Sequence, residues 1–436
     1  MEKRKFVIFG ASGNLATAKI YPALYRLFLR GIFCDYTGFG RTPFSDREFR
    51  SLVRKSLPEK GKKVEEFLEK FNYVTGSYDK DGIKSLKNQT KGFSVTYYMA
   101  IPITYDLIKN TLLGFEENKL IDKDTKIVLE KPFGTDFISA EKLNVLLNKY
   151  FEEKQIFRID HYLAKDLIKN LFVLRFANPI FEPVWDNKYI KSVNITLKED
   201  AGIEGRGEYY DQTGAIKDVI QNHLLQLLTL VTMDRPEDLS SAAIHEEKSR
   251  ILGKVRLFKE KGLENIEIGQ YKSYKSEKEV GEDSLTETKA SLRVEVNTER
   301  WRGVPIYLST GKKLEKKTSD IAIEFKSEEE HLWQGSCSIP AENKLFINVQ
   351  PEYSVKLQLN SISDSENVCP RPISLSFSFL ESETVVRDAY ENALFDLHQN
   401  DRSVFLGSDE ILYSWKFIDS VLEKINPKRK ELLKFY

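Results

Sequence analysis

The sequence predicts two domains: a doubly wound α/β domain at the N-terminus, followed by an α+β domain with a large, mainly antiparallel sheet. At the start of the chain, short apolar runs alternate with helical patterns, as in parallel sheets whose strands are joined by crossover helices. Further along, many segments alternate apolar and polar residues, which indicates strands with one buried face. A length of 436 residues also exceeds what a single ordinary core accommodates.

The doubly wound domain is expected to span residues 1–155. Its first strand is the buried run at 6–9, and the helical pattern at 20–29 ends near Gly31. Further short apolar runs predict additional parallel strands at 36–39, 96–99 and 126–129.

The α+β domain is expected to span residues 156–436 and to carry the surface for oligomerisation. Helical patterns occupy 160–176 and 215–233, and an amphipathic helix at 407–425 ends the domain. The charged segments 272–284 and 326–330 are typical of solvated loops. Period-two alternation predicts strands at 193–197, 292–296, 321–325, 345–349, 355–359 and 373–379.

The composition excludes several classes of protein. Lysine and arginine number 66, as do aspartate and glutamate, and a net charge of zero argues against a nucleic-acid-coating surface or a polybasic membrane binder. Three scattered cysteines are too few for a disulfide framework or a zinc cluster, so no metal is expected. The N-terminal apolar run is too short for a signal peptide, and no stretch reaches membrane-spanning length. We therefore expect a soluble cytoplasmic protein without a nucleic-acid or membrane partner.

A glycine-containing turn follows the first strand and opens the first helix. Gly10 permits the tight turn, Gly13 lets the backbone approach a pyrophosphate, and Ala16 keeps helix and strand close. Amides at the start of the helix would supply the anion site. This context favours a Rossmann dinucleotide site over a purely structural turn. The candidate contacts are Gly10, Ala11, Ser12, Gly13, Asn14 and Leu15.

The coenzyme preference depends on the end of the second strand. An NAD site carries a carboxylate there for the ribose 2′-hydroxyl, whereas a 2′-phosphate requires arginine. Arg41 and Thr42 follow this strand, and Asp35 lies at its other end. The pattern favours NADP. The alternative is that Arg41 is an ordinary solvated arginine.

A histidine, a tyrosine and a lysine gather at the start of the 160–176 pattern. On a helix, His161 and Lys165 would lie one turn apart on one face, with Tyr162 beside them. This group could clamp a phosphate. The alternative is a helix N-cap at Asp160 followed by an ordinary polar turn.

His223 falls within the apolar stripe of the 215–233 pattern. A histidine in such a stripe is more often a satisfied core residue, but a buried imidazole held by a carboxylate would suit a general base near neutral pH. Asp218 lies about 140° away at about 100° per residue, so an α-helix would not pair the two. The carboxylate that orients His223 must then come from elsewhere.

Six motifs together resemble those of glucose-6-phosphate dehydrogenases. They occur in the family's order and cover nearly the whole chain, and Arg-Ile-Asp-His-Tyr-Leu is close to diagnostic. The motifs lie at residues 10–16, 130–134, 158–163, 218–225, 300–305 and 311–312.

The resemblance implies oxidation of glucose 6-phosphate at C1 to the lactone, with hydride passing to NADP. His223 would be the base and Asp160 would orient it. His161, Tyr162 and Lys165 would bind the phosphate, Glu199 and Asp218 the sugar hydroxyls, and Lys312 and Lys317 would add positive charge. Lys131 would touch both substrate and nicotinamide, with Pro132 as the hinge between domains. Lys19, Arg41, Thr42 and Tyr98 match coenzyme-side or site-rim positions. We also expect a homodimer or homotetramer.

A few positions depart from the family pattern. Asn14 stands where aspartate is usual, Ala164 where glycine is usual, and Ile103 where a second proline is common. Asn348 occupies the position of an arginine that holds a second, structural NADP in some members, so we expect one NADP per subunit.

Two alternative functions remain at this point. One is a sugar oxidoreductase of the broader fold group, which would lack the phosphate clamp. The other is an NADP-sensing regulator, which would need no base.

Overall fold

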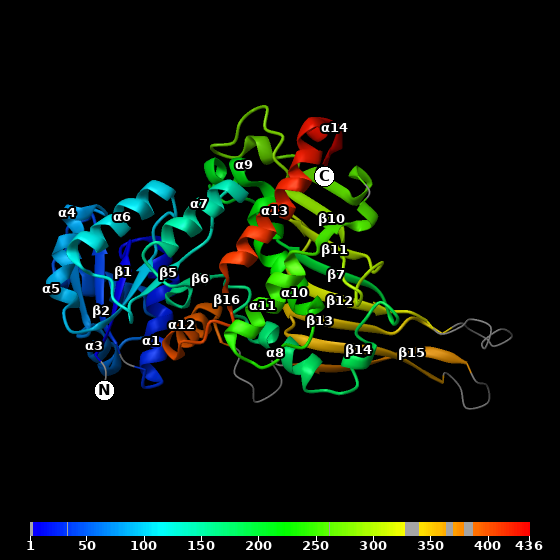
Figure 1. Ribbon diagram of the computed structural model, residues 1–436, viewed down its shortest axis with the longest axis horizontal. Coiled ribbons are helices and arrows are strands. Elements are labelled where there is room, and N and C mark those ends of the chain that lie inside the picture. Colours follow the sequence, from blue (N-terminus) through cyan, green and yellow to red (C-terminus); the bar gives the residue numbers. More distant parts are fainter. Residues whose placement is uncertain (1–2, 33, 261, 328–339, 363–368, 379–386) are drawn as a thin grey trace. The chain divides into compact units, whose positions relative to one another are not determined.

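The computed structural model describes residues 3–32, 34–260, 262–327, 340–362, 369–378 and 387–436 (Figure 1). The chain divides into two compact units. Unit 1 contains residues 1–165, 240–245 and 387–412, and unit 2 contains residues 166–239, 246–386 and 413–436.

Unit 1 is built on a seven-stranded sheet with the order β16-β6-β5-β4-β1-β2-β3. All neighbouring strands are parallel except β16, which is antiparallel to β6. The chain order reverses between β1 and β4, as in dinucleotide-binding folds. The predicted doubly wound domain is thus confirmed. Its strands are β1 (Arg4–Phe9), β2 (Asp35–Gly40), β3 (Phe71–Thr75), β4 (Ser94–Met99), β5 (Lys126–Leu129), β6 (Ile156–Ile159) and β16 (Phe405–Leu406).

The strands β3 and β6 were not predicted. The expected domain boundary at residue 155 falls immediately before β6, which pairs with β5 and therefore belongs to the first sheet. Because this pairing adds a sixth parallel strand, unit 1 continues to Lys165. A domain boundary placed where the residue pattern changes could not show that β6 pairs with β5.

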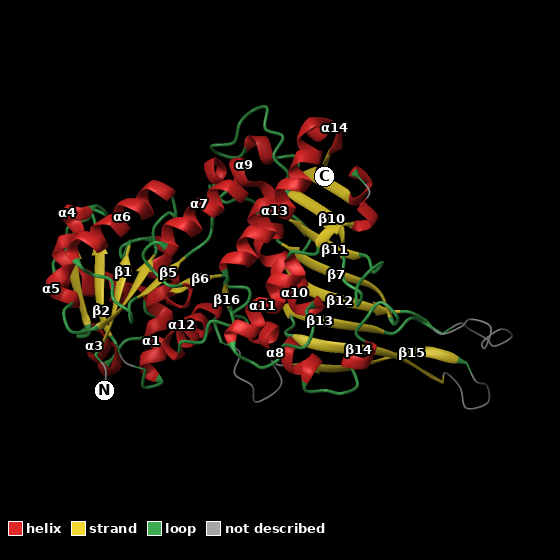
Figure 2. Cartoon of the chain, viewed as in Figure 1, coloured by secondary structure: helices red, strands yellow, loops and turns green. Residues whose placement is uncertain are grey.

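Helices surround this sheet (Figure 2). The predicted first helix is present and ends before Gly31, whose φ of 81° suits glycine. The helix α12 comes from the C-terminal part of the chain, and Arg26 and Arg30 of α1 form ion pairs with its Glu391. The main helices are α1 (Tyr21–Leu29), α2 (Asp46–Ser56), α3 (Lys62–Leu68), α6 (Tyr105–Asn118), α7 (Phe137–Asn148) and α12 (Ala389–Gln399), with the shorter α4 (Lys80–Ile83) and α5 (Lys87–Thr90).

Unit 2 is built on a ten-stranded, mainly antiparallel sheet, as predicted. Its order is β15-β14-β13-β12-β7-β11-β10-β9-β17, and β8 pairs with β10. The parallel neighbours are β7 with β11 and β9 with β17. The strands are β7 (Ile190–Lys198), β8 (Val255–Leu257), β9 (Ile266–Gln270), β10 (Lys289–Val296), β11 (Ile306–Gly311), β12 (Thr318–Phe325), β13 (Lys344–Gln350), β14 (Ser354–Ile362), β15 (Pro370–Ser378) and β17 (Leu433–Phe435).

Burial follows the predicted period of two only in the middle of this sheet. In β12 and β13 every second residue is buried. At the edge, Ile373, Leu375 and Phe377 of β15 are 36%, 57% and 51% exposed. The apolar face of the edge strand is therefore uncovered in the single chain.

Three sequence predictions for helices and loops after residue 155 need correction. The pattern at 160–176 forms a helix only from Asp166, because residues 161–165 form turns. The pattern at 215–233 is divided between a π-helical segment and α10. The loop at 272–284 is not merely solvated, because Tyr274 is fully buried and its hydroxyl donates to Asp211 at 3.0 Å. The predicted loop at 326–330 lies partly outside the described residues.

The helices of this part of the chain are α8 (Asp166–Phe176), α9 (Gly207–Ala215), the π-helical η5 (Ile216–Leu224), α10 (Leu225–Thr232), α11 (Ser241–Leu252), α13 (Ser408–Ile425) and α14 (Arg429–Leu432). The helices α11 and α13 contain residues of both units, and α13 confirms the predicted final amphipathic helix. Among the described cysteines, Cys34 is a free thiol and Cys369 is disulfide-bonded, a bond that the scattered cysteine positions did not predict.

Candidate active site

The glycine turn lies where the strand order of unit 1 reverses. Gly10 has a φ of 70°, and a Cβ atom there would lie 2.4 Å from the carbonyl oxygen of Ala100, so glycine is required. The Gly10 amide donates to Phe39 at 3.0 Å and the Gly13 amide donates to Gly10 at 2.8 Å. The backbone thus has the tight turn that was predicted, and Gly13 and Asn14 are exposed where a phosphate would approach.

Two tyrosines that the sequence reasoning missed support this turn from beneath. The hydroxyl of buried Tyr21 donates to the Ala11 carbonyl at 2.5 Å. The Tyr78 hydroxyl is hydrogen-bonded to the Gly10 backbone. Ala11 and Ala16 are fully buried, whereas Ser12 and Leu15 are half-buried. Tyr21 lies five residues after Ala16, and its contact with the glycine turn could be predicted only if the conformation of the first helical turn were already known.

Arg41 lies beside the glycine turn at the carboxyl end of β2. It is exposed, and its guanidinium carbon lies 5.8 Å from the centre of the Tyr78 ring. The backbone of Thr42 is held by the Tyr73 hydroxyl, which donates to its carbonyl at 2.7 Å. The guanidinium is therefore available near the coenzyme turn, at the opposite end of β2 from Asp35.

Glu130 is the centre of a buried hydrogen-bonded group at the carboxyl end of β5. Tyr98 donates to its carboxylate, and Tyr390 of α12 is also hydrogen-bonded to it. Burial raises the pKa of Glu130 to about 7, although the two tyrosines and Lys131 oppose the rise. Half-buried Lys131 follows directly and is joined to Pro132 by a cis peptide bond.

Tyr98, a predicted coenzyme-side residue, belongs to this buried group. Its side chain is fully buried and its hydroxyl donates a hydrogen bond to Glu130. Neither Glu130 nor Tyr390 was among the candidates. Glu130 stands in one of the quoted motifs, but Tyr390 gave no signal because it comes from a distant helix.

The residues that were predicted to clamp a phosphate lie on a turn rather than on a helix. β6 ends at Ile159, and buried Asp160 accepts a hydrogen bond from the Tyr162 amide at 2.9 Å. The Lys165 amide then donates to the Tyr162 carbonyl at 3.2 Å. A carboxylate that binds the backbone two residues later stabilises a turn in place of a helix start.

The side chains that were expected together are nevertheless neighbours. The Lys165 ammonium lies 3.7 Å from the centre of the Tyr162 ring, and the rings of His161 and Tyr162 are 5.2 Å apart. His161 and Lys165 are half-buried. The turn thus presents an imidazole, a phenol and an ammonium at the carboxyl end of β6.

In unit 2, the predicted sugar-binding residues come from the ends of three adjacent strands. β7 and β11 are parallel, with Lys198 opposite Gly311, so Glu199 and Lys312 follow side by side and form an ion pair. Lys312 is only 3% exposed. Lys317 precedes β12, whose first residue pairs with Lys198, so it lies at the same edge and is exposed.

His223 is buried within the π-helical segment, and this geometry alters its relation to Asp218. The two residues are five apart, which is the spacing of π-helical hydrogen bonds, so they lie about one turn apart. The predicted separation of about 140° assumed α-helical winding and was wrong for this reason. Asp218 is buried and accepts a hydrogen bond from the Tyr209 hydroxyl at 3.3 Å.

The fold and the site together define a class of protein, the two-domain nucleotide-dependent oxidoreductases. The parallel sheet carries a glycine turn of the dinucleotide-binding type, and histidine, carboxylate and lysine side chains lie around the strand ends. The solved structure of levoglucosan dehydrogenase in complex with NADH covers 98% of each chain with a TM-score of 0.54, but its 8% identity shows the fold alone.

Comparison with known proteins identifies the family. The model for "Glucose-6-phosphate dehydrogenase, NAD binding domain" matches residues 7–170, and the model for its C-terminal domain matches residues 172–436. Glucose-6-phosphate 1-dehydrogenase of Borreliella burgdorferi is 38% identical over 96% of this chain and 91% of its own length. The cytoplasmic isoform 5 of Arabidopsis thaliana is 35% identical over 96% and 86%.

A solved glucose-6-phosphate dehydrogenase in complex with glucose 6-phosphate has a TM-score of 0.92 and 32% identity, and the match covers 100% of this chain and 94% of that one. The chain therefore belongs to the glucose-6-phosphate dehydrogenase family of oxidoreductases. Among the described helices, none combines the length and apolar composition that a membrane crossing requires.

Proposed function

We propose that this protein oxidises glucose 6-phosphate at C1 to 6-phosphoglucono-1,5-lactone and passes the hydride to NADP, the first step of the oxidative pentose phosphate pathway. The observation that carries the proposal is the turn at 160–165, which gathers an imidazole, a phenol and an ammonium in a chain of this family. A sugar phosphate is a dianion at neutral pH and needs several such groups. We assign its phosphate to His161, Tyr162 and Lys165.

The proposed chemistry divides C1 oxidation between a base and a hydride acceptor. His223 takes the proton of the C1 hydroxyl while the C1 hydrogen leaves with its electron pair, so that the carbonyl forms. Asp160 orients the imidazole and stabilises the imidazolium. Asp160 belongs to unit 1 and His223 to unit 2, and we take their pairing from the family resemblance. When bound, NADP supplies the nicotinamide that accepts the hydride.

The remaining assignments place the sugar ring. The Glu199–Lys312 ion pair gives a carboxylate and an ammonium fixed side by side, which suits adjacent hydroxyl groups. We assign sugar hydroxyls to Glu199 and Asp218, and added positive charge to Lys312 and Lys317. Lys131 would contact both substrate and nicotinamide.

We further propose that NADP is preferred to NAD and binds once per subunit. The exposed guanidinium of Arg41 beside the glycine turn supports recognition of a 2′-phosphate. The neutral amide of Asn348 donates to Glu352 at 3.2 Å and to Ser354 at 2.9 Å, which gives no support to a phosphate site there. Equilibrium titration of the coenzyme-free protein should give one NADP per chain, and two would contradict this assignment.

We propose that the protein is a cytoplasmic homodimer or homotetramer. The uncovered apolar side chains of β15 support self-association, because an edge strand of this kind pairs readily with a second copy. A relative with 35% identity is a cytoplasmic isoform. Sedimentation equilibrium should give two or four chains per particle, and Leu375→Asp should reduce that number.

The decisive assay mixes purified protein with NADP and glucose 6-phosphate and follows the absorbance of the reduced coenzyme. We expect a much higher kcat/KM than with unphosphorylated glucose. Equal efficiency on the two sugars would indicate an oxidoreductase without a phosphate clamp, and no reduction with either would favour a coenzyme-binding regulator.

A further inference from the structure

We propose that Tyr210 is a further substrate-binding residue, whose phenolic hydroxyl donates a hydrogen bond to the hydroxyl group at C2, C3 or C4 of glucose 6-phosphate. Tyr210 lies in α9, directly after Tyr209, and it was not a candidate from the sequence. The inference rests on the proposed function, because its ligand is the substrate proposed there.

The Tyr210 hydroxyl is buried and has no hydrogen-bond partner among the described residues. The side chain is only 1% exposed, so bulk water does not reach the hydroxyl. Buried tyrosine hydroxyls usually have a partner, because an unsatisfied buried donor destabilises the folded protein. An exception therefore needs an explanation, and a ligand that brings the missing acceptor provides one.

The neighbouring tyrosines of the same apolar cluster are satisfied. The Tyr274 hydroxyl donates to Asp211 at 3.0 Å, and the Tyr271 hydroxyl donates to Glu277 at 3.1 Å. The ring of Tyr210 packs edge-on against that of Tyr274, with ring centres 6.3 Å apart. Packing thus fixes the ring of Tyr210 as it fixes its neighbours, and only its hydroxyl is exceptional.

The Tyr210 side chain lies beside the residues proposed to bind the sugar ring. The Lys312 ammonium is 5.2 Å from the centre of the Tyr210 ring and forms the ion pair with Glu199. Tyr209, the preceding residue, donates to Asp218. All of these residues belong to unit 2, so one compact unit places the unsatisfied hydroxyl among them.

The surrounding charges keep the Tyr210 hydroxyl protonated and therefore a donor. Burial, followed by the charges of Asp218, Glu287 and Glu199, raises the pKa of Tyr210 well above its usual value. Each of these carboxylates already accepts a hydrogen bond from another side chain, and the donors are Tyr209, Arg429 and Lys312, respectively. The protein thus holds a proton donor near carboxylates that do not accept from it.

A sugar hydroxyl has the chemistry that complements this arrangement. Its oxygen can accept from Tyr210 while its own proton is donated to a carboxylate such as Asp218. A site that binds a hydroxyl in this way also selects against an analogue that lacks it, because the buried donor then remains unpaired. Tyr210 would therefore contribute to specificity as well as to binding.

Tyr210→Phe tests the inference, because it removes the hydroxyl and keeps the ring. With saturating NADP we expect kcat/KM for glucose 6-phosphate to fall about tenfold, since one hydrogen bond to the substrate is lost. Without substrate, the variant should unfold at an equal or higher urea concentration than the unmodified protein, because an unsatisfied donor has been removed. A residue with a purely structural role would lose stability instead.

The 2-, 3- and 4-deoxy analogues of glucose 6-phosphate locate the contact. One of them lacks the hydroxyl bound by Tyr210, and on this analogue the unmodified protein and Tyr210→Phe should have the same kcat/KM. The other two analogues should retain the difference of about tenfold.

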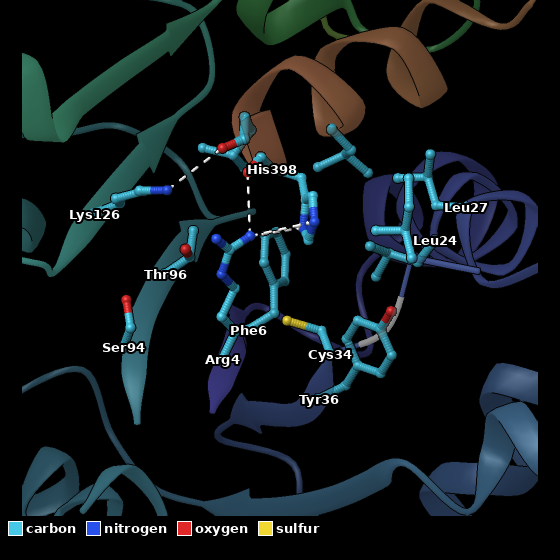
Figure 3. A pocket seen from close by; sticks show the side chains of 13 residues that line it. Arg4, Phe6, Leu24, Leu27, Cys34, Tyr36, Ser94, Thr96, Lys126 and His398 are labelled. Atoms are coloured by element: carbon cyan, nitrogen blue, oxygen red, sulfur yellow. Dashed lines mark hydrogen bonds between the residues drawn. The ribbon is translucent and has the colours of Figure 1, made fainter. Parts of the chain in front are cut away.

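Two other buried tyrosines provide matched controls. Tyr274→Phe leaves Asp211 without one of its donors, so it should lower stability and change kcat/KM by one common factor for all four sugars. Tyr36 of β2 lines a cavity of about 50 Å³ in unit 1 (Figure 3), and Tyr36→Phe should leave kcat/KM unchanged.

The same assays separate this inference from the proposed function. If the unmodified protein does not reduce NADP with glucose 6-phosphate, both are overturned. If it does, the assignment of Tyr210 alone is overturned by full kcat/KM in Tyr210→Phe, by a loss of stability in this variant, or by an equal loss of activity on all four sugars.

Discussion

The ring of Tyr390 stacks on the imidazole of His161, with ring centres 6.3 Å apart and planes 11° apart. The Tyr390 hydroxyl is also bonded to Glu130, which precedes Lys131. One tyrosine from a distant helix thus connects the proposed phosphate residues with the proposed nicotinamide side.

Tyr390 should position His161 for the substrate phosphate. Tyr390→Leu removes the ring and should raise the KM for glucose 6-phosphate by about tenfold, with a smaller change in kcat, because a misplaced imidazole weakens binding more than chemistry. Tyr390→Phe keeps the stacking and should recover most of the affinity. Steady-state kinetics measures both. An unchanged KM in Tyr390→Leu, with Tyr413→Leu on the exposed side of α13 as control, would contradict this role.

His223→Asn should lower kcat by roughly 10²–10⁴-fold while glucose 6-phosphate still binds, because the amide cannot accept the C1 hydroxyl proton. Asp160→Asn should lower kcat as well, since the imidazolium then lacks its carboxylate. Binding is followed separately by thermal shift with the substrate. A rate close to that of the unmodified enzyme in His223→Asn would exclude this histidine as the base.

Arg41→Ala should raise the KM for NADP much more than the KM for NAD, because only NADP carries the 2′-phosphate. Arg47→Ala, an exposed arginine on the neighbouring α2, provides the matched control. Michaelis constants for both coenzymes are needed for each variant. Parallel changes for the two coenzymes would mean that Arg41 is an ordinary surface residue.

Glu130 should make the protein less stable as the pH rises from about 4.5 to about 7. Its pKa is raised by burial, so in this window the folded state holds a proton that the unfolded state releases, and the free energy of unfolding falls with pH. The pKa of Glu130 lies about 2.5 above its usual value, which corresponds to a loss of about 3 kcal/mol in the free energy of unfolding across this window.

Glu130→Gln removes this titration and should therefore gain stability relative to the unmodified protein as the pH increases across the window. Urea unfolding at pH 5, 6, 7 and 8 measures the difference, with Glu117→Gln on the exposed side of α6 as control. The same pH slope in Glu130→Gln and the unmodified protein would show that Glu130 does not titrate there.

Several features could be predicted because they depend on short stretches of chain. The glycine turn, the four strands around it and the helix that ends at Leu29 follow from apolar runs and from the conformational freedom of Gly10. The alternation of β12 and β13 gave the second sheet. The identities of the proposed site residues came from motifs and from the family resemblance, so they too lay in the sequence.

The misplaced elements are those whose form depends on distant partners. Periodicity could not show that residues 161–165 form a turn, because the Asp160 carboxylate competes with the helix for the Tyr162 amide. It also could not show the π-helical winding that brings Asp218 and His223 one turn apart. Strand β6 was assigned to the wrong domain because only its pairing with β5 places it.

The sequence by itself determined the fold class, the coenzyme turn and the chemical types of the proposed site residues, since these depend on local backbone preference and on the order of motifs. Tertiary structure alone decided that Tyr390 lies on His161 and that Glu199 meets Lys312. Each of these joins residues far apart in the chain. Their contacts arise from strand order and helix packing, which no local pattern of residues encodes.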